Sequence, residues 1–317
     1  MCIFTRKVFM FRWVAALLLL VCLTAPGRTA DAAEPLVDAA WAVSHIGGEN
    51  IRFLDIRRGG AEDFTAAHIP GAVFSDYFRA GWRVTGADGT PGMLPPVADL
   101  ETLVGGLGIA NASHVIIVAR GLSAIEMASA ARVFWTFKVI GHDAVSILDG
   151  GMTAYMALLS PPIESGPAPP AETRPFKASF RRALVASKAE VIAAQESGGL
   201  LLDLRPKSQY SGARGPSFLR RKGTIAGARN LPLNRLTEGG AFKTQAALAE
   251  LFSAVDAAEG EPITCFCNTG HMASLGWFVA HELLGNEAAR LYDGSMVEWS
   301  ADPAQGVVTG ETGKTGD

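Results

Sequence analysis

Short apolar runs rich in β-branched residues alternate along this chain with longer stretches in which apolar residues recur at helical spacing. One run lies at 114–118 and another at 262–266; each is followed by a helical stretch and then by a further short run, at 145–149 and at 289–293. Strands that alternate with helices in this way form mostly parallel sheets, which helices cover on both faces. The pattern therefore predicts an α/β fold.

The two halves of the chain repeat one pattern. Residues 53–57 (FLDIR) are followed by an apolar segment at 69–73, and residues 201–205 (LLDLR) by a related segment at 225–231. Self-similarity of this kind indicates two copies of one structural unit. A proline-rich stretch that favours neither helix nor sheet lies between them. The predicted division is an N-terminal domain at 34–159, a linker at 160–175, a C-terminal domain at 176–305 and a flexible tail at 306–317.

The first residues have the pattern of an export signal. Three basic residues precede an apolar run at 13–23, and small residues follow at 30–32. The run is shorter than the roughly 20 residues that a membrane span needs. We therefore expect a signal peptide at 1–32, a periplasmic or otherwise exported protein, and no stable membrane insertion after cleavage. An uncleaved anchor is the alternative.

Composition and charge narrow the function classes. With 317 residues, 49% of them hydrophobic and 19% charged, the chain can bury full cores, which argues against disorder. Residues 1–32 carry four basic and one acidic side chain, so their removal makes the net charge of −3 more negative. A net negative charge argues against a nucleic-acid partner.

Cysteine usage points to chemistry. Cys2 and Cys22 fall in the predicted signal, which leaves Cys265 and Cys267 and no framework of disulfides. An unpaired cysteine in an oxidising compartment indicates a reactive thiol, with burial of a small apolar side chain as the alternative. We interpret Cys265 as a buried neighbour, although a reversible bond between the two cysteines is conceivable.

Cys267 stands where a predicted strand ends and a predicted helix begins. In open α/β sheets ligands bind at the carboxyl ends of strands, and a helix N-terminus there offers unpaired N–H groups and partial positive charge. Such a position favours a nucleophilic thiolate, and a loop of backbone donors could cradle a persulfide anion. The predicted persulfide-cradling loop comprises Asn268, Thr269, Gly270, His271, Met272 and Ala273.

The cysteine that opens this six-residue turn, the Tyr292–Ser295 segment (YDGS) and the Asp-x-Arg strand ends together resemble the tandem-domain rhodanese family of thiosulfate and 3-mercaptopyruvate sulfurtransferases. The resemblance covers nearly the whole chain after the signal. It implies two rhodanese-like domains, the first catalytically inactive because Ala119 stands where the second has Cys267. It also implies sulfur transfer through a Cys267 persulfide, with no metal and no organic cofactor. The implied partners are a small-molecule sulfur donor and a thiol or cyanide-like acceptor, or a protein acceptor.

The donor is left open by departures from the family pattern. Asn268 is neutral where thiosulfate enzymes have arginine, whereas Thr269 resembles the hydroxyl residue of the mercaptopyruvate type. Gln209 replaces an arginine that both types usually carry. Arg205 could supply the missing positive charge, and Asp76 lies in a segment where the resembled family has acidic residues near the cleft. These two residues are the candidate substrate-binding residues.

Each of these candidates has a structural alternative. Arg205 could instead form an ion pair with Asp203. In the segment that contains Asp76, Phe78 and Gly92 replace an acidic residue and a histidine of the family, which weakens its case. His271 could either act as a titratable imidazole beside the thiolate or be structural.

Two other function classes are weighed against a sulfurtransferase. A noncatalytic sulfur carrier of the same fold would form the persulfide but turn over little with free donors. A cysteine-dependent phosphatase would need a loop arginine to clamp its dianion, yet Ala273 stands at the end of the loop and no Lys or Arg follows Cys267 before Arg290. The phosphatase is therefore the less favoured alternative.

Overall fold

A computed structural model describes Met1 and residues 34–58, 61–168, 170–257 and 260–310. The predicted signal peptide at 1–32, Met1 apart, lies outside the described residues, as do residues 311–317 of the predicted tail. Among the helices of the described part, none combines the length and the apolar character needed to cross a membrane.

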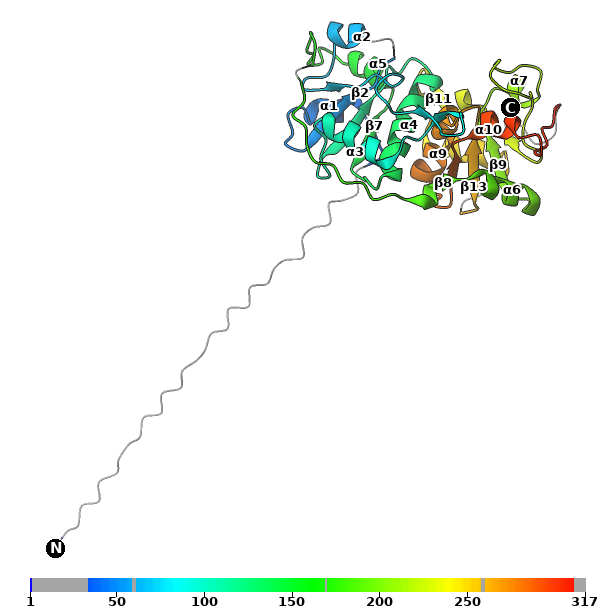
Figure 1. Ribbon diagram of the computed structural model, residues 1–317. Helices are drawn as coiled ribbons and strands as arrows, with labels where there is room; N and C mark the ends of the chain where they lie inside the picture. Colours follow the sequence, from blue (N-terminus) through cyan, green and yellow to red (C-terminus); the bar gives the residue numbers. More distant parts are fainter. Residues whose placement is uncertain (2–33, 59–60, 169, 258–259, 311–317) are drawn as a thin grey trace. The chain divides into compact units, whose positions relative to one another are not determined.

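The first domain is built on a parallel five-stranded sheet with strand order β1-β7-β6-β2-β3 (Figure 1). Each neighbouring pair in it is parallel, as the alternation of strands and helices predicts. Its strands are β1 (Leu36–Val37), β2 (Ile51–Asp55), β3 (Val73–Phe74), β6 (His114–Val118) and β7 (Val145–Leu148).

The second domain repeats this topology with strand order β10-β9-β13-β14-β8, again with parallel neighbours. Its central strand β13 corresponds to β6 and pairs with β9 and β14. The strands are β8 (Val185–Ala186), β9 (Leu200–Asp203), β10 (Arg229–Asn230), β13 (Ile263–Phe266) and β14 (Arg290–Tyr292). The repeat predicted from the sequence is therefore a repeat of one sheet topology.

Helices cover both faces of each sheet because successive strand residues point to opposite faces and both sets are apolar. In β6, for example, Ile116 and Ile117 belong to different hydrophobic clusters. The α-helices are α1 (Ala39–Ser44), α2 (Ala61–Ala66), α3 (Val97–Gly106), α4 (Ala124–Val139), α5 (Gly151–Met156), α6 (Lys188–Ser197), α7 (Lys207–Tyr210), α8 (Gln245–Ser253), α9 (His271–Phe278) and α10 (Ser295–Ala301). Two short 3-10 helices lie at Arg182–Leu184 and Leu233–Arg235, and a π-helical turn at Val279–Leu283 continues α9.

The two domains share a hydrophobic core formed around α4 and α9. The ring of Phe134 in α4 meets the ring of Phe278 in α9 edge to face, with centroids 4.9 Å apart. Almost every residue of both helices is buried. A helix that is apolar on all sides belongs inside a protein, and here the second domain completes the burial of α4. Figure 1 shows α4 and α9 next to each other, where the two domains meet.

Each domain also carries a small antiparallel hairpin outside its sheet. In the first domain β4 (Val84–Thr85) pairs with β5 (Pro91–Met93). In the second, β11 (Thr237–Glu238) pairs with β12 (Ala241–Phe242). Each hairpin reaches the opposite domain: the N–H of Leu94, just after β5, donates to Asp293, and that of Phe242 donates to Asp149. The hairpins therefore connect the carboxyl edge of each sheet to its partner domain.

The predicted linker follows the surface of the first domain. Glu164 forms an antiparallel bridge with His68, and Arg174 donates its N–H to the carbonyl of Gly105. The chain stays with that domain past residue 176, since Arg181 donates its N–H to Val139. The fold of the second domain thus begins at the 3-10 helix before β8, a few residues later than the sequence suggests.

The start of the predicted flexible tail is attached to the second domain. Val308 and Thr224 exchange two backbone hydrogen bonds of 2.9 Å in an antiparallel bridge. The expectation of a tail beginning at residue 306 therefore fails for residues 306–310, because this bridge and the packing of Val307 hold them.

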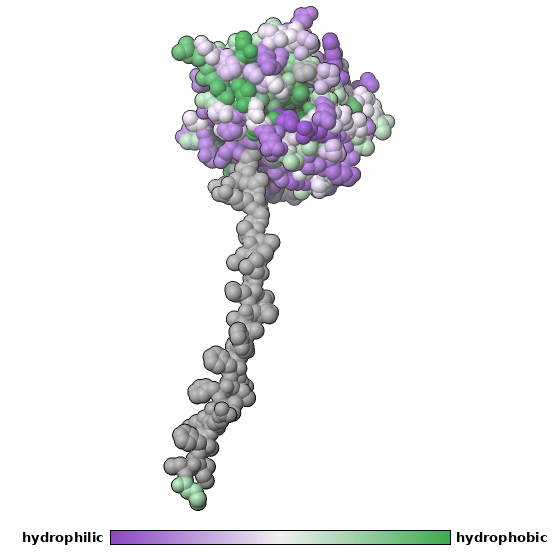
Figure 2. All heavy atoms as spheres, turned by 90° about the vertical axis from the view of Figure 1, so that its left-hand side faces the viewer, coloured by the Kyte–Doolittle hydropathy of each residue, from purple (hydrophilic) through white to green (hydrophobic). Residues whose placement is uncertain are grey.

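Hydrophobic side chains are mostly internal. Figure 2 shows one face on which polar residues predominate and apolar ones gather in a limited area. The large hydrophobic side chains exposed between residues 34 and 168 are Phe78, Leu122, Met156, Leu159 and Ile163.

Candidate active site

Cys267 directly follows β13, the central strand of the second sheet, and its side chain is buried. The chain turns at Gly270, which has φ +71°, and α9 begins at the next residue. A left-handed backbone is easy only for glycine, so Gly270 allows the tight turn that brings the start of α9 back toward Cys267. The first N–H groups of any helix lack partners within the helix. The predicted meeting of a strand end, the thiol and a helix N-terminus is therefore present.

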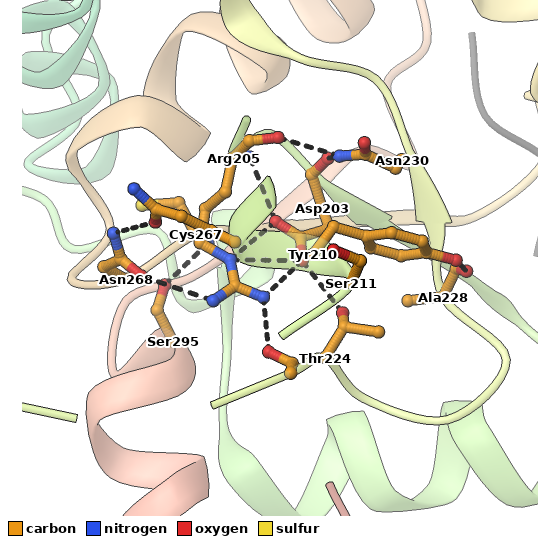
Figure 3. Close-up of polar contacts among 12 residues, drawn as sticks. Asp203, Arg205, Tyr210, Ser211, Thr224, Ala228, Asn230, Cys267, Asn268 and Ser295 are labelled. Atoms are coloured by element: carbon orange, nitrogen blue, oxygen red, sulfur yellow. Dashed lines mark hydrogen bonds and ion pairs between the residues drawn. The ribbon is translucent and has the colours of Figure 1, made fainter. Parts of the chain in front are cut away.

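Ser295 holds the two ends of the catalytic loop together. Its Oγ accepts hydrogen bonds from the N–H of Cys267 (3.1 Å) and from that of Gly270 (3.0 Å), and donates to the carbonyl of Tyr292. Figure 3 shows Ser295 beside Cys267 and Asn268. One buried hydroxyl therefore fixes the width of the loop, a role that sequence reasoning did not assign to the YDGS segment.

Asn268 is anchored on the side of the loop that faces β9. Its Nδ2 donates to Oε1 of Gln209 at 2.8 Å, and its Oδ1 lies 3.4 Å from a guanidinium nitrogen of Arg205 (Figure 3). The two residues that depart from the family pattern, Asn268 and Gln209, are thus partners of each other. A neutral amide pair occupies this flank of the loop.

Arg205 lies beneath the loop as half of a buried ion pair. Its guanidinium contacts Asp203 at 2.6 Å and the carbonyl of Gly223 at 2.8 Å, and both charged side chains are 0% exposed. Arg57 and Asp55 form the same pair at the end of β2 in the first domain. Because the arrangement recurs in the half that lacks the cysteine, it belongs to the fold, and it matches the structural alternative for Arg205.

Asp76 acts within its own turn. Its Oδ1 accepts from the N–H groups of Phe78 (2.8 Å) and Arg79 (3.1 Å), as an Asx turn does. No hydrogen bond links Asp76 to the 267–273 loop within the described residues. Its neighbour Tyr77 does reach this loop, through His271.

The first domain contributes a buried charge to the site. Arg132 of α4 donates to Asp293 at 2.5 Å, and its guanidinium also approaches the carbonyls of Gly270 (3.5 Å) and Gly92 (3.3 Å). Asp293 in turn accepts from the N–H of Leu94 at 2.6 Å. A buried ion pair therefore joins α4, the β4–β5 hairpin and the catalytic loop.

A second first-domain arginine contacts the loop directly. Arg83 donates from Nη2 to the carbonyl of Thr269 at 2.6 Å and from Nε to the carbonyl of Gly92 at 3.1 Å. Gly92 has φ +82°, and a Cβ there would lie 2.1 Å from that Nη2 and 3.2 Å from Cβ of Thr269. Glycine at position 92 thus leaves the space that the Arg83 guanidinium fills.

His271 is held by two groups of the first domain. The Tyr77 hydroxyl lies 2.6 Å from Nδ1, and the carbonyl of Ile125 lies 3.1 Å from Nε2. Burial, reinforced by the charge of Arg83, lowers the pKa of His271 from 6.5 to about 3, which favours the neutral ring. In that ring Nε2 carries the proton and donates to the Ile125 carbonyl, while Nδ1 accepts from the Tyr77 hydroxyl. The lowered pKa thus favours the structural alternative for His271 over a charged imidazole beside the thiolate.

Because the pKa of His271 is lowered in the folded protein, we expect the free energy of unfolding to fall in acid. Between pH 6.5 and about 3 the unfolded chain binds a proton at His271 that the folded protein does not, so stability falls as the pH falls through this window. The slope is about 1.4 kcal/mol per pH unit for one such histidine. His114, with a pKa lowered by burial to about 4, adds a similar loss.

Urea unfolding at several pH values measures this effect. His271→Gln, which can keep both hydrogen bonds, should lose stability less steeply between pH 6.5 and 4.5 than the wild type. Equal slopes for the two proteins would rule out the assigned protonation.

Cys265 is a buried neighbour of the site, as interpreted from the sequence. It is a free thiol, and burial raises its pKa well above the ordinary value. Cys267 is also a free thiol. A neutral, buried Cys265 is a poor nucleophile, which leaves Cys267 as the candidate nucleophile of the site.

The structure brings the predicted loop together and adds residues that the sequence did not reveal. Ala273 is buried, and Thr269 and Met272 are partly exposed. The additional residues are Tyr77, Arg83, Arg132, Asp293 and Ser295. The sequence does carry a signal for Arg132, because a charged residue within a mostly apolar stretch of predicted helix indicates a buried ion pair. Within the described residues no group of three or more His, Cys, Asp or Glu side chains could hold a metal ion.

The first domain has a residue in the place of Cys267 that cannot act as a nucleophile. The N–H of Met152 donates to the carbonyl of Ala119 at 2.8 Å, as that of Met296 donates to the carbonyl of Cys267 at 3.0 Å. The structure thus confirms that Ala119 occupies the position corresponding to the cysteine.

Together, the fold and site define a protein of two α/β domains with a free cysteine in the loop between the central strand of the second domain and a helix. A family model described as "Rhodanese-like domain" matches the chain twice, at residues 38–158 and 187–302. The chain belongs to the rhodanese-like domain family.

Sulfurtransferases are among its relatives. The chain is 31% identical to the thiosulfate sulfurtransferase of Bos taurus over 297 residues, which cover 88% of this chain and 97% of that one. It is 30% identical to the 3-mercaptopyruvate sulfurtransferase of Homo sapiens over 302 residues, which cover 93% and 92%. Its relatives of both donor types are thus about equally similar to it.

Solved structures share the fold. SseA from Escherichia coli, described with the "Rhodanese" fold and the catalytic mechanism of 3-mercaptopyruvate sulfotransferases, superposes with a TM-score of 0.68 at 27% identity, covering 82% of this chain and 98% of that chain. The wild-type structure of EanB superposes with a TM-score of 0.77 at 19% identity, covering 87% of this chain and 69% of that one. The second likeness establishes the fold alone.

Proposed function

We propose that this protein is a sulfurtransferase that moves a sulfane sulfur from a small donor to a thiophilic acceptor through a persulfide on Cys267. The observation that carries the proposal is the placement of Cys267 after the central strand, in a loop that Ser295 closes and α9 follows. The sulfurtransferase relatives over nearly the full chain support it.

The proposed reaction has two halves. The Cys267 thiolate attacks the transferable sulfur of the donor and a new sulfur–sulfur bond forms. In thiosulfate the original S–S bond breaks and sulfite leaves with its electron pair; in 3-mercaptopyruvate the C–S bond breaks, and the enolate that leaves takes up a proton to become pyruvate. The acceptor then attacks the outer sulfur of the persulfide and restores the thiolate. The partial positive charge of the start of α9 would stabilise the anion in both states. Neither half requires a metal or an organic cofactor.

The donor is tested by steady-state kinetics of the purified protein with thiosulfate and with 3-mercaptopyruvate, using one thiol acceptor throughout. A sulfurtransferase releases product over many turnovers with at least one donor. A folded protein that forms one persulfide and then stops would contradict the proposed enzymatic activity. It would favour a sulfur carrier that serves a protein partner.

We also propose that the protein is exported to the periplasm or an equivalent compartment. The basic residues before the apolar run at 13–23 and the small residues at 30–32 support this. Fractionation of expressing cells, followed by N-terminal sequencing, tests it. The expected product is an exported protein that starts near residue 33, and a cytoplasmic protein with its N-terminus intact would contradict export.

A further inference from the structure

Three arginine side chains approach the catalytic loop, and their charges differ in how they are compensated. Arg205 approaches Asn268 and is paired with Asp203. Arg132 approaches Gly270 and is paired with Asp293. Arg83 bonds Thr269, and among the described residues no carboxylate lies within ion-pair distance of it. Arg83 alone therefore brings an uncompensated positive charge to the loop.

The half-buried Arg83 brings that charge to the edge of the loop, where it bonds the carbonyls of Thr269 and Gly92. Its charge opposes the effect of burial on Tyr77, whose pKa burial raises, and it contributes to the lowered pKa of His271. The nearby Cys267 also acts on Tyr77. Both carbonyls that Arg83 bonds are neutral acceptors. A partly buried guanidinium with only neutral partners favours binding of an anion.

We propose that Arg83, supplied by the catalytically inactive first domain, holds the oxyanion of the sulfur donor while Cys267 attacks the donor's outer sulfur. The donor is then a small anion, with its transferable sulfur either bonded to an SO3 group, as in thiosulfate, or a few atoms from a carboxylate, as in 3-mercaptopyruvate. Arg83 takes the place of the substrate clamp that Gln209 does not provide. This inference rests on the proposed sulfurtransferase function.

The first test compares Arg83→Gln and Arg83→Lys with the wild type in the two-donor assay, using a neutral thiol acceptor. Arg83→Gln should raise the KM of the anionic donor about 10- to 100-fold, the scale of a lost charge-assisted hydrogen bond, and leave the KM of the neutral acceptor unchanged. Arg83→Lys should recover part of the loss because it keeps the charge. Different sensitivity of thiosulfate and 3-mercaptopyruvate would show which anion the guanidinium fits.

The matched control is Arg58→Gln. Arg58 also lies in the first domain and its charge also acts on His271, but its guanidinium stacks on the Phe78 ring and no hydrogen bond joins it to the loop in the described structure. It should change donor KM less than threefold. An equal effect of both substitutions would assign the result to the general field of the protein and overturn the specific role of Arg83.

The second test does not need sulfur transfer. Iodoacetate and iodoacetamide alkylate a thiolate in the same way, with loss of iodide, but only iodoacetate is an anion. Peptide mass mapping gives the rate of each at Cys267. Arg83→Gln should lower the ratio of the iodoacetate rate to the iodoacetamide rate about tenfold, as expected for one lost charged contact. An unchanged ratio would overturn the anion site even if the enzyme turns over, whereas a lowered ratio without turnover would reject the proposed function alone.

Discussion

Replacement of Cys267 by serine is expected to lower sulfur transfer by at least about three orders of magnitude, since the nucleophile carries the covalent intermediate. A serine hydroxyl in the same loop keeps the shape of the site and its hydrogen bonds to Ser295. It cannot store a sulfur atom as a stable anion. Steady-state rates with both donors measure the loss, and unfolding by urea verifies that the variant is folded.

The matched control for this prediction is Cys265→Ala. Cys265 lies two residues earlier on β13, is buried, and has a raised pKa. Its removal should cost about 1 kcal/mol of stability, as for a small core truncation, and leave the rate per folded molecule within about threefold. If Cys265→Ala stopped transfer while Cys267→Ser retained it, the assignment of the nucleophile would be wrong.

Disruption of the ion pair between Arg132 and Asp293 is expected to have the next largest effect. Both side chains are buried, and removal of one partner leaves an unpaired charge in the shared core. Arg132→Met should therefore cost about 3–5 kcal/mol of unfolding free energy. Activity should also fall, because Arg132 approaches the carbonyl of Gly270 in the loop.

A double-mutant cycle distinguishes the pair from its separate contacts. Asp293→Asn alone should be destabilising, while the double variant Arg132→Met/Asp293→Asn should be less destabilised than the sum of the two single variants, by about 1–3 kcal/mol. Strict additivity would mean that the two side chains do not interact in solution. Arg181→Met, which removes the more exposed pair with Asp143, is the control and should cost about 1 kcal/mol or less.

The sequence predicts the fold well because its signals are local. Apolar strands, helical spacing and the repeated Asp-x-Arg ends identify two similar sheets, and the glycine before α9 marks the loop of Cys267. The position of Arg205 was predicted but its role was left open, since an arginine two residues after an aspartate is equally suited to substrate or to structure. The matching pair of Arg57 and Asp55 in the first domain favours the structural alternative.

Three of the residues that the sequence could not reveal come from the other domain. Tyr77, Arg83 and Arg132 are far from Cys267 in the chain, and the contact between the two domains brings them to its loop. The spacing of apolar residues along the chain does not show which residues of one domain contact the other. The consequence of this contact is that the first domain, which has Ala119 in the place of Cys267, still supplies charge and hydrogen bonds to the site, and one hydrophobic core spans both domains.

The central claim is most directly tested by the mass of the protein after incubation with a sulfur donor in the absence of an acceptor. Intact-mass and peptide mass spectrometry should show one added sulfur atom, located on Cys267, which disappears when a thiol acceptor is added. We expect this addition in the wild type and in Cys265→Ala, but not in Cys267→Ser. A wild-type protein that turns over donor without ever carrying sulfur on Cys267, or that carries it elsewhere, would rule out the Cys267 persulfide.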